Sequence, residues 1–178
     1  MALSKWNFDP AHSEVSFRVR HMMFSKVTGF FHDWEGDFEF DPDDPAHTDV
    51  TVDIDVSSID TKNKDRDQHL RSEDFFNTET HPHIHFDSTG VEQTGEGTFE
   101  LHGDLSIAGN TEPVVLDVEY HGKAVDPWGN DRVGFTATTK INRKDFGLTW
   151  NQALEAGGVL VGDKVEIEIQ AQATPADA

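Results

Sequence analysis

Apolar and polar residues alternate with a period of two along most of the chain. Successive side chains of an extended strand point to opposite faces, so this pattern predicts strands with one apolar and one polar face. The clearest case is the run 49–56, in which Val50, Val52, Ile54 and Val56 alternate with polar, mostly acidic, neighbours. A helical period would instead scatter these four residues around the helix axis.

Seven further segments read as strands, most of them by the same alternation. Turn signals rich in Gly, Pro, Asn and Asp separate many of them, as at 41–45 and 126–129. About eight strands with short loops favour a closed or nearly closed antiparallel barrel, because closure leaves few exposed strand edges. The fold class is therefore predicted to be all-β. The seven segments are 15–21, 30–40, 84–86, 97–107, 114–120, 133–141 and 165–173.

One polar segment without alternation interrupts the strands, near residues 61–76. Thr61 or Asn63 is suited to cap a short helix there. A second turn then carries Phe75 and Phe76 toward the apolar interior. We expect a barrel with a short helical insert across one mouth.

Composition limits the number of domains and the classes of partner. The 178 residues suffice for one domain, predicted over 1–173, followed by a flexible tail at 174–178. The chain carries 34 Asp and Glu against 14 Lys and Arg, a formal charge of −20. Such a field repels phosphate backbones and anionic membranes, which excludes nucleic-acid binding through a broad basic face.

Other features bear on cellular location and covalent chemistry. The chain has no Cys, so it offers no disulfide, thiolate nucleophile or Cys-ligated metal. Its apolar stretches are far shorter than the about 20 residues of a membrane span, and no secretory signal is evident. We expect a soluble, cytoplasmic protein without an integral membrane segment or a cofactor.

The sequence His81-Pro-His-Ile-His85 is a candidate metal motif. In a strand, His83 and His85 share a face and could chelate one ion, which would favour a metal-dependent enzyme. The alternative is that both imidazoles point outward, opposite Ile84 and Phe86. No third ligand is evident from the sequence.

Basic residues cluster in an otherwise acidic chain. Ten of the fourteen fall in three short spans. A locally basic mouth could receive an anionic head group, whereas the alternative is that these side chains pair with neighbouring acids on a solvated surface. The three spans hold Arg18, Arg20 and Lys26; Lys62, Lys64, Arg66 and Arg71; and Lys140, Arg143 and Lys144.

Aromatic residues dominate the faces assigned to the interior. They could simply fill a small barrel, but eight strands also leave room for one slender ligand. A continuous strand over 30–40 would run roughly 35 Å at about 3.3 Å per residue, and a long apolar tube fits an elongated lipid. The aromatic residues of this parity are Phe17, Phe30, Trp34, Phe38, Phe40, Phe86, Phe99 and Phe135.

Several sequence blocks together resemble the YceI-like family over about residues 5–172. Each block is weak alone, but the set is specific. The matching blocks lie at 6–13, 27–31, 67–76, 86–89, 103–111, 142–148 and 161–165.

The resemblance implies a lipocalin-like extended antiparallel barrel that binds a polyisoprenoid, an isoprenoid quinone or a similar long-chain lipid for storage or transport. Members are not established enzymes, and many are periplasmic. This chain departs from the family at Glu112, where a basic residue commonly follows Gly-x-Thr. We expect the lipid chain to contact Phe17, Val19, His21, Trp34, Phe38, Phe75, Phe76, Phe86 and Phe135, and the head group to lie near His69 and Arg71.

Two rival hypotheses remain from the sequence. One is the metal-dependent enzyme built on His83 and His85. The other is a non-catalytic stress or dimerisation protein, present as a homodimer, whose pocket is vestigial. Mass spectrometry of organic extracts of the purified protein separates lipid binding from both.

Overall fold

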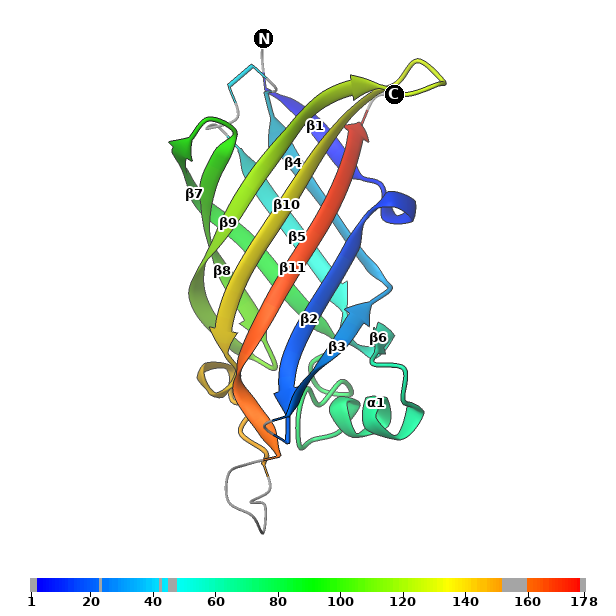
Figure 1. Ribbon diagram of the computed structural model, residues 1–178, viewed down its shortest axis with the longest axis vertical. Helices are drawn as coiled ribbons and strands as arrows, with labels where there is room; N and C mark the ends of the chain where they lie inside the picture. Colours follow the sequence, from blue (N-terminus) through cyan, green and yellow to red (C-terminus); the bar gives the residue numbers. More distant parts are fainter. Residues whose placement is uncertain (1–2, 23, 42, 45–47, 152–159, 177–178) are drawn as a thin grey trace.

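The computed structural model describes residues 3–22, 24–41, 43–44, 48–151 and 160–176. Their strands form one antiparallel sheet that winds into a barrel (Figure 1). In chain order the strands are β1 (Ser4–Phe8), β2 (Glu14–His21), β3 (Ser25–Phe31), β4 (Trp34–Phe40), β5 (Asp49–Asp55), β6 (Ile59–Asp60), β7 (His83–Gly95), β8 (Thr98–Ile107), β9 (Asn110–Val125), β10 (Asp131–Asn142) and β11 (Val161–Pro175).

The eleven strands occupy eight positions around the barrel, because three positions each hold two short strands. The three pairs are β1 with β2, β3 with β4, and β5 with β6. The 3-10 turn η1 (Pro10–His12) separates β1 from β2, and η2 (Val56–Ser58) separates β5 from β6. β11 closes the ring by pairing first with β2, from Val161 to Gln170, and then with β1, from Ala173 to Pro175. The predicted closed antiparallel barrel of about eight strands is confirmed.

The prediction of one continuous strand over 30–40 is wrong. His32 and Asp33 lie outside the strands, so β3 and β4 are separate and the phase of alternation shifts by one residue between them. In β3 the inward residue is Phe31, whereas in β4 the inward residues are Trp34 and Phe38. Phe30 therefore does not line the interior. The ring of Phe30 stacks instead on His32, with centroids 6.3 Å apart.

Strand β11 continues two residues into the tail that we expected at 174–178. Thr174 pairs with Asn7 and Pro175 with Trp6. The Ala176 amide also donates to the Lys5 carbonyl at 2.9 Å. The edge of β1 supplies these backbone partners, which a local reading of the sequence does not reveal.

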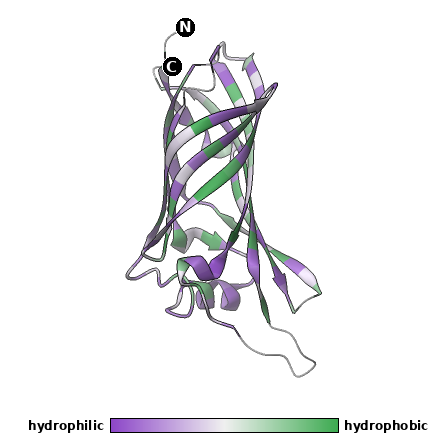
Figure 2. Cartoon of the chain, turned by 90° about the vertical axis from the view of Figure 1, so that its left-hand side faces the viewer, coloured by the Kyte–Doolittle hydropathy of each residue, from purple (hydrophilic) through white to green (hydrophobic). Residues whose placement is uncertain are grey.

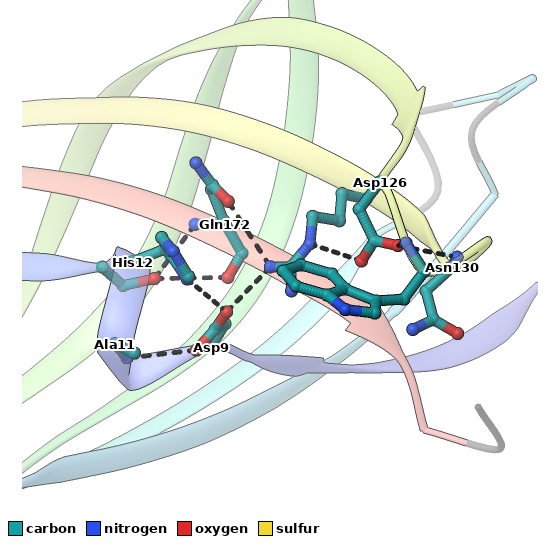
Figure 3. A network of polar contacts seen from close by, with 9 residues as sticks. Asp9, Ala11, His12, Asp126, Asn130 and Gln172 are labelled. Atoms are coloured by element: carbon teal, nitrogen blue, oxygen red, sulfur yellow. Dashed lines mark hydrogen bonds and ion pairs between the residues drawn. The ribbon is translucent and has the colours of Figure 1, made fainter.

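A polar network holds the joint at which β1 replaces β2 beside β11 (Figure 3). Arg132 donates from Nη1 to Asp9 at 2.7 Å and from Nε to Asp126 at 2.9 Å. These contacts connect β10, the β9–β10 turn and the end of β1. The Arg132 guanidinium is the main reason that the pKa of Asp9 is lowered, with further contributions from His12 and the Ala11 amide against the effect of burial.

The helical insert is confirmed as α1 (Lys64–Arg71), which lies across the end of the barrel away from the described chain ends (Figure 1). Asn63 is the N-cap, and its Oδ1 accepts from the Arg66 amide at 3.0 Å. The chain then turns at Ser72, whose hydroxyl donates to the His69 carbonyl. Among the described residues, no helix has the length and apolar character required to cross a bilayer.

Green and purple segments alternate along the strands in Figure 2, as the period of two predicts. The apolar faces form two clusters inside the barrel. The first surrounds Val15, Ile84 and Leu116 in the half nearer α1. The second contains Trp6, Phe38 and Phe40 at the opposite end. Packing of both clusters supplies most of the driving force for folding.

Candidate ligand cavity

The barrel encloses a cavity of about 770 Å³ whose wall is mostly apolar. This volume lies within the range of about 300–1,000 Å³ typical of small-molecule sites. The wall combines aliphatic side chains from most of the strands with aromatic rings at both ends. The aliphatic wall residues include Val15, Val19, Val52, Ile54, Ile84, Leu101, Leu105, Leu116, Val118, Ile141, Ile167 and Ile169.

Ten of the eleven residues predicted to contact the ligand line this cavity, although their role in binding is untested. The strands of the barrel supply seven of them, and α1 with the turn that follows it supplies three. They are Phe17, Val19, His21, Trp34, Phe38, Phe86 and Phe135 from the strands, and His69, Phe75 and Phe76 from the insert.

Arg71 is the exception, because it does not line the cavity. Its Nε donates to the Ser57 carbonyl at 3.1 Å, and its Nη2 approaches the Ile59 carbonyl at 3.4 Å. Asp67, one turn earlier on α1, accepts hydrogen bonds from the amide and the hydroxyl of Thr61. The assignment of Arg71 to the head group is therefore corrected. Its side chain anchors α1 to the segment between β5 and β6.

Aromatic rings close the cavity at the end opposite α1. Phe38 packs edge-on against Phe135 with centroids 5.7 Å apart, and Phe40 contacts the same ring at 5.4 Å. Tyr120 completes the cluster, edge-on to Phe40 at 5.5 Å and tilted against Phe135 at 5.1 Å. Such edge-to-face pairs favour a fixed arrangement. This end of the barrel is packed with side chains.

Two rings of the wall lie directly over glycines on neighbouring strands. A Cβ at Gly29 would lie 2.3 Å from Cζ of Phe17, and one at Gly103 would lie 2.4 Å from Cζ of Phe86. Both glycines are buried. Only hydrogen in place of a side chain leaves space for these rings, so the two glycines determine how far the rings project into the cavity.

The charged residues of the wall lie at the α1 end. His21 comes from the end of β2, and His69 and Arg66 come from α1. The His69 ring packs edge-on against Trp150 at 4.6 Å and against Phe75 at 5.2 Å, and its Nε2 lies 2.8 Å from Asp74. The cavity is therefore amphipathic, with an apolar body and a polar end.

Arg143 is a buried cation beside this polar end. Its guanidinium donates to the carbonyls of Leu148 at 2.6 Å, Trp150 at 2.9 Å and Gly162 at 2.9 Å. Burial lowers its pKa, and the nearby Asp163 acts in the opposite direction. These bonds fix the backbone on both sides of 152–159, so Arg143 has a structural role.

Sequence reasoning missed several residues of the wall as ligand contacts. The break before β4 puts Phe31 on the inward face, where a continuous strand over 30–40 would put Phe30. Phe8 and Arg66 belong to blocks that the sequence did single out, so a signal existed for both. Trp150 follows no periodic pattern, and only the tertiary structure places it against His69.

The histidine motif lies outside the cavity. Ile84 and Phe86 line the wall, so His83 and His85 occupy the outward face, as the alternative interpretation expected. The Nδ1 of His85 lies 2.6 Å from Asp53, and its Nε2 lies 2.7 Å from Asp87. These hydrogen bonds, first to Asp53 and then to Asp87, raise the pKa of His85. Both ring nitrogens are thus already engaged.

Ion pairs account for part of the basic clusters. Lys26 lies 2.6 Å from Glu166 and Arg18 lies 3.4 Å from Glu168, both on the outer surface of β2, β3 and β11. Lys144 lies 3.4 Å from Asp163. For these three cations, pairing with neighbouring acids is the correct interpretation.

Comparison with known proteins identifies relatives over most of the chain. A family model described as the YceI-like domain matches residues 6–173. A UPF0312 protein of Azotobacter vinelandii is 42% identical over 137 residues, which cover 77% of this chain and 71% of that protein. A UPF0312 protein of Staphylococcus epidermidis is 39% identical over 171 residues, or 96% and 97% of the two chains.

Solved structures share the fold. BcnA of Burkholderia cenocepacia superposes with a TM-score of 0.82 at 24% identity, over 93% of this chain and 98% of that one. The YceI protein of Campylobacter jejuni gives 0.75 at 31% identity, over 87% and 88%. A polyisoprenoid-binding domain from Saccharophagus degradans gives 0.72 at 14% identity, over 98% and 99%.

The family match and the identities to full-length relatives agree with the barrel and its internal cavity. The chain belongs to the YceI-like family.

Proposed function

We propose that this protein binds a long-chain isoprenoid lipid inside the barrel and acts as a binding protein rather than an enzyme. The observation that carries the proposal is the cavity of about 770 Å³, with its apolar body and polar end. An amphiphile with a long apolar chain matches this arrangement. The Saccharophagus degradans neighbour, described as a polyisoprenoid-binding domain, supports the same class of ligand.

Burial of the lipid chain supplies the binding free energy. Each methylene transferred from water to an apolar environment contributes about 0.8 kcal/mol. Affinity therefore rises with chain length until the chain fills the cavity. The aromatic end formed by Phe38, Phe40 and Phe135 is packed, so this end sets the limit of length.

Organic extraction of the purified protein followed by mass spectrometry tests the proposal directly. We expect a stoichiometric lipid with a branched, unsaturated chain. Titration of delipidated protein with prenyl alcohols of increasing length should show an affinity that rises and then reaches a plateau. Absence of extractable lipid together with no binding of any prenyl alcohol would contradict the proposal.

A further inference from the structure

Three side chains that can bind a metal lie together on the outer face of the hairpin formed by β7 and β8 (Figure 1). Glu92 comes from β7, and Glu100 and His102 come from β8. One ligand atom of each residue lies within 4.8 Å of the other two. Val91 and Leu101, their neighbours along the two strands, line the cavity. The three side chains therefore lie on the opposite side of the barrel wall.

The register of the two strands brings the carboxylates together. Glu92 pairs directly with Glu100, and His102 follows at the next position on the same face. Like charges directly opposite each other on a sheet are destabilising. In the part of the chain that the structure describes, no Lys or Arg nitrogen lies within 4.0 Å of either carboxylate. The two glutamates thus form an anionic pair that no arginine or lysine neutralises.

The Nε2 atom of His102 is buried and has no hydrogen-bond partner among the described residues. It lies 3.9 Å from a carboxylate oxygen of Glu92 and 4.0 Å from one of Glu100, which is too long for a hydrogen bond. On the neighbouring strands it faces Gly90 and Val115, and neither has a polar side chain. A buried nitrogen without a partner is costly, and a bound ion is one way to satisfy it.

The separations are close to those of ligands that share one ion. Zn–N and Zn–O bonds are about 2.0–2.2 Å long, so two ligand atoms at a tetrahedral angle lie roughly 3.4 Å apart. Small rotations of the two glutamate side chains reach this distance. Beside His102, a Cβ at Gly90 would have no atom within 4 Å, so water ligands have space. The His102 side chain is 38% exposed, which gives an ion access from solvent.

We propose that Glu92, Glu100 and His102 bind one divalent transition-metal ion of the Zn²⁺ class, with water as the remaining ligand. Imidazole nitrogen combined with carboxylate oxygen favours Zn²⁺ and similar ions, whereas Mg²⁺ and Ca²⁺ take oxygen ligands. Binding through Nε2 uses the neutral imidazole with its proton on Nδ1. The site is separate from the lipid cavity and does not depend on the proposed function.

The position of the site on the hairpin indicates what the ion does. Among the described residues, β5 pairs with β7 only from His83 to Asp87. Beyond that point β7 pairs with β8 alone, from Ser88 to Gly95. An ion held by Glu92 and by the two β8 residues ties this half of β7 to its single strand neighbour. An ion that binds only the folded chain stabilises the fold.

Calorimetric titration of EDTA-stripped, untagged protein with ZnCl₂ tests the site. We expect one equivalent of Zn²⁺ to bind. CaCl₂ should bind at least about 10-fold more weakly, because one of the three ligands is a nitrogen. At a free Zn²⁺ concentration of about 100 times Kd, the melting temperature should rise by about 5–10 °C.

Matched variants locate the ion. His102→Gln removes the nitrogen ligand and should weaken Zn²⁺ binding at least about 100-fold, more than the loss of an outer-shell partner does. Glu92→Gln, at an exposed position, should weaken it at least about 10-fold and provides a second test if His102→Gln does not fold. His121→Gln is the control and should leave the affinity unchanged. His121 is an exposed histidine on β9 that lies 3.9 Å from Glu119, outside the site.

Three results would overturn the proposal. The first is wild-type protein that binds no stoichiometric Zn²⁺. The second is an equal loss of affinity in His102→Gln and His121→Gln, which would mean an adventitious ion only, captured by an acidic surface. The third is Ca²⁺ binding as tight as that of Zn²⁺, since the nitrogen ligand would then contribute nothing. None of these measurements involves the lipid, so lipid binding stands or fails independently.

Discussion

Ala137 on β10 offers a direct test of whether the lumen is open space. Its side chain lines the cavity between two other wall residues, Ile169 on β11 and Val118 on β9. Ala137→Phe places a ring in the middle of the barrel. A cavity of about 150 Å³ accommodates benzene, so one phenyl group takes about a fifth of the available volume. It also interrupts the path of a long chain.

The sign of the stability change distinguishes an open lumen from a packed core. If the lumen is open, the new ring gains apolar burial, worth up to about 2 kcal/mol, and the delipidated variant is as stable as the wild type or more stable. If side chains already fill the lumen, overpacking costs about 1–3 kcal/mol. Urea denaturation of the two delipidated proteins measures the difference.

Lipid titration completes the test. We expect Ala137→Phe to bind a C20 prenyl alcohol at least about 10-fold more weakly, because each methylene displaced into water loses about 0.8 kcal/mol. Thr138→Phe, one residue away on the exposed face, serves as the control and should bind normally. A destabilised Ala137→Phe protein that retains wild-type lipid affinity would refute this account of the cavity.

Three further substitutions have expected outcomes. Gly29→Ala puts a methyl group against the Phe17 ring and should lower the free energy of unfolding by about 1–3 kcal/mol, whereas Gly90→Ala, with open space around its Cβ, should not. Arg143→Met leaves buried carbonyls without donors and should cost at least about 2 kcal/mol, measured by urea denaturation. His85 has a raised pKa, so its ion pairs stabilise the fold fully below about pH 6.5 and lose this effect as pH rises through the raised value. The melting-temperature difference between wild type and His85→Gln should therefore shrink on going from about pH 5 to about pH 9, and a constant difference would contradict this.

The sequence alone determined the number of strand positions and most of their inward faces. Alternation with a period of two is a local property of an extended chain, so Val50, Val52 and Ile54 could be assigned to the interior without knowledge of their partners. The helical insert was also predictable, because the Asn63 cap is a local signal. For the same reason, ten of eleven proposed contact residues line the cavity.

Only the tertiary structure decided the features that depend on distant partners. The break at His32 changes the inward residue from Phe30 to Phe31, and no local propensity indicates it. Arg66 and Arg71 are both helical cations in the same basic span. Only the docking of α1 decides that Arg66 lines the cavity and that Arg71 bonds to the Ser57 carbonyl. The volume of the cavity likewise depends on which side chains face each other across the barrel and on how far apart they lie. The order of residues along the chain does not give that separation.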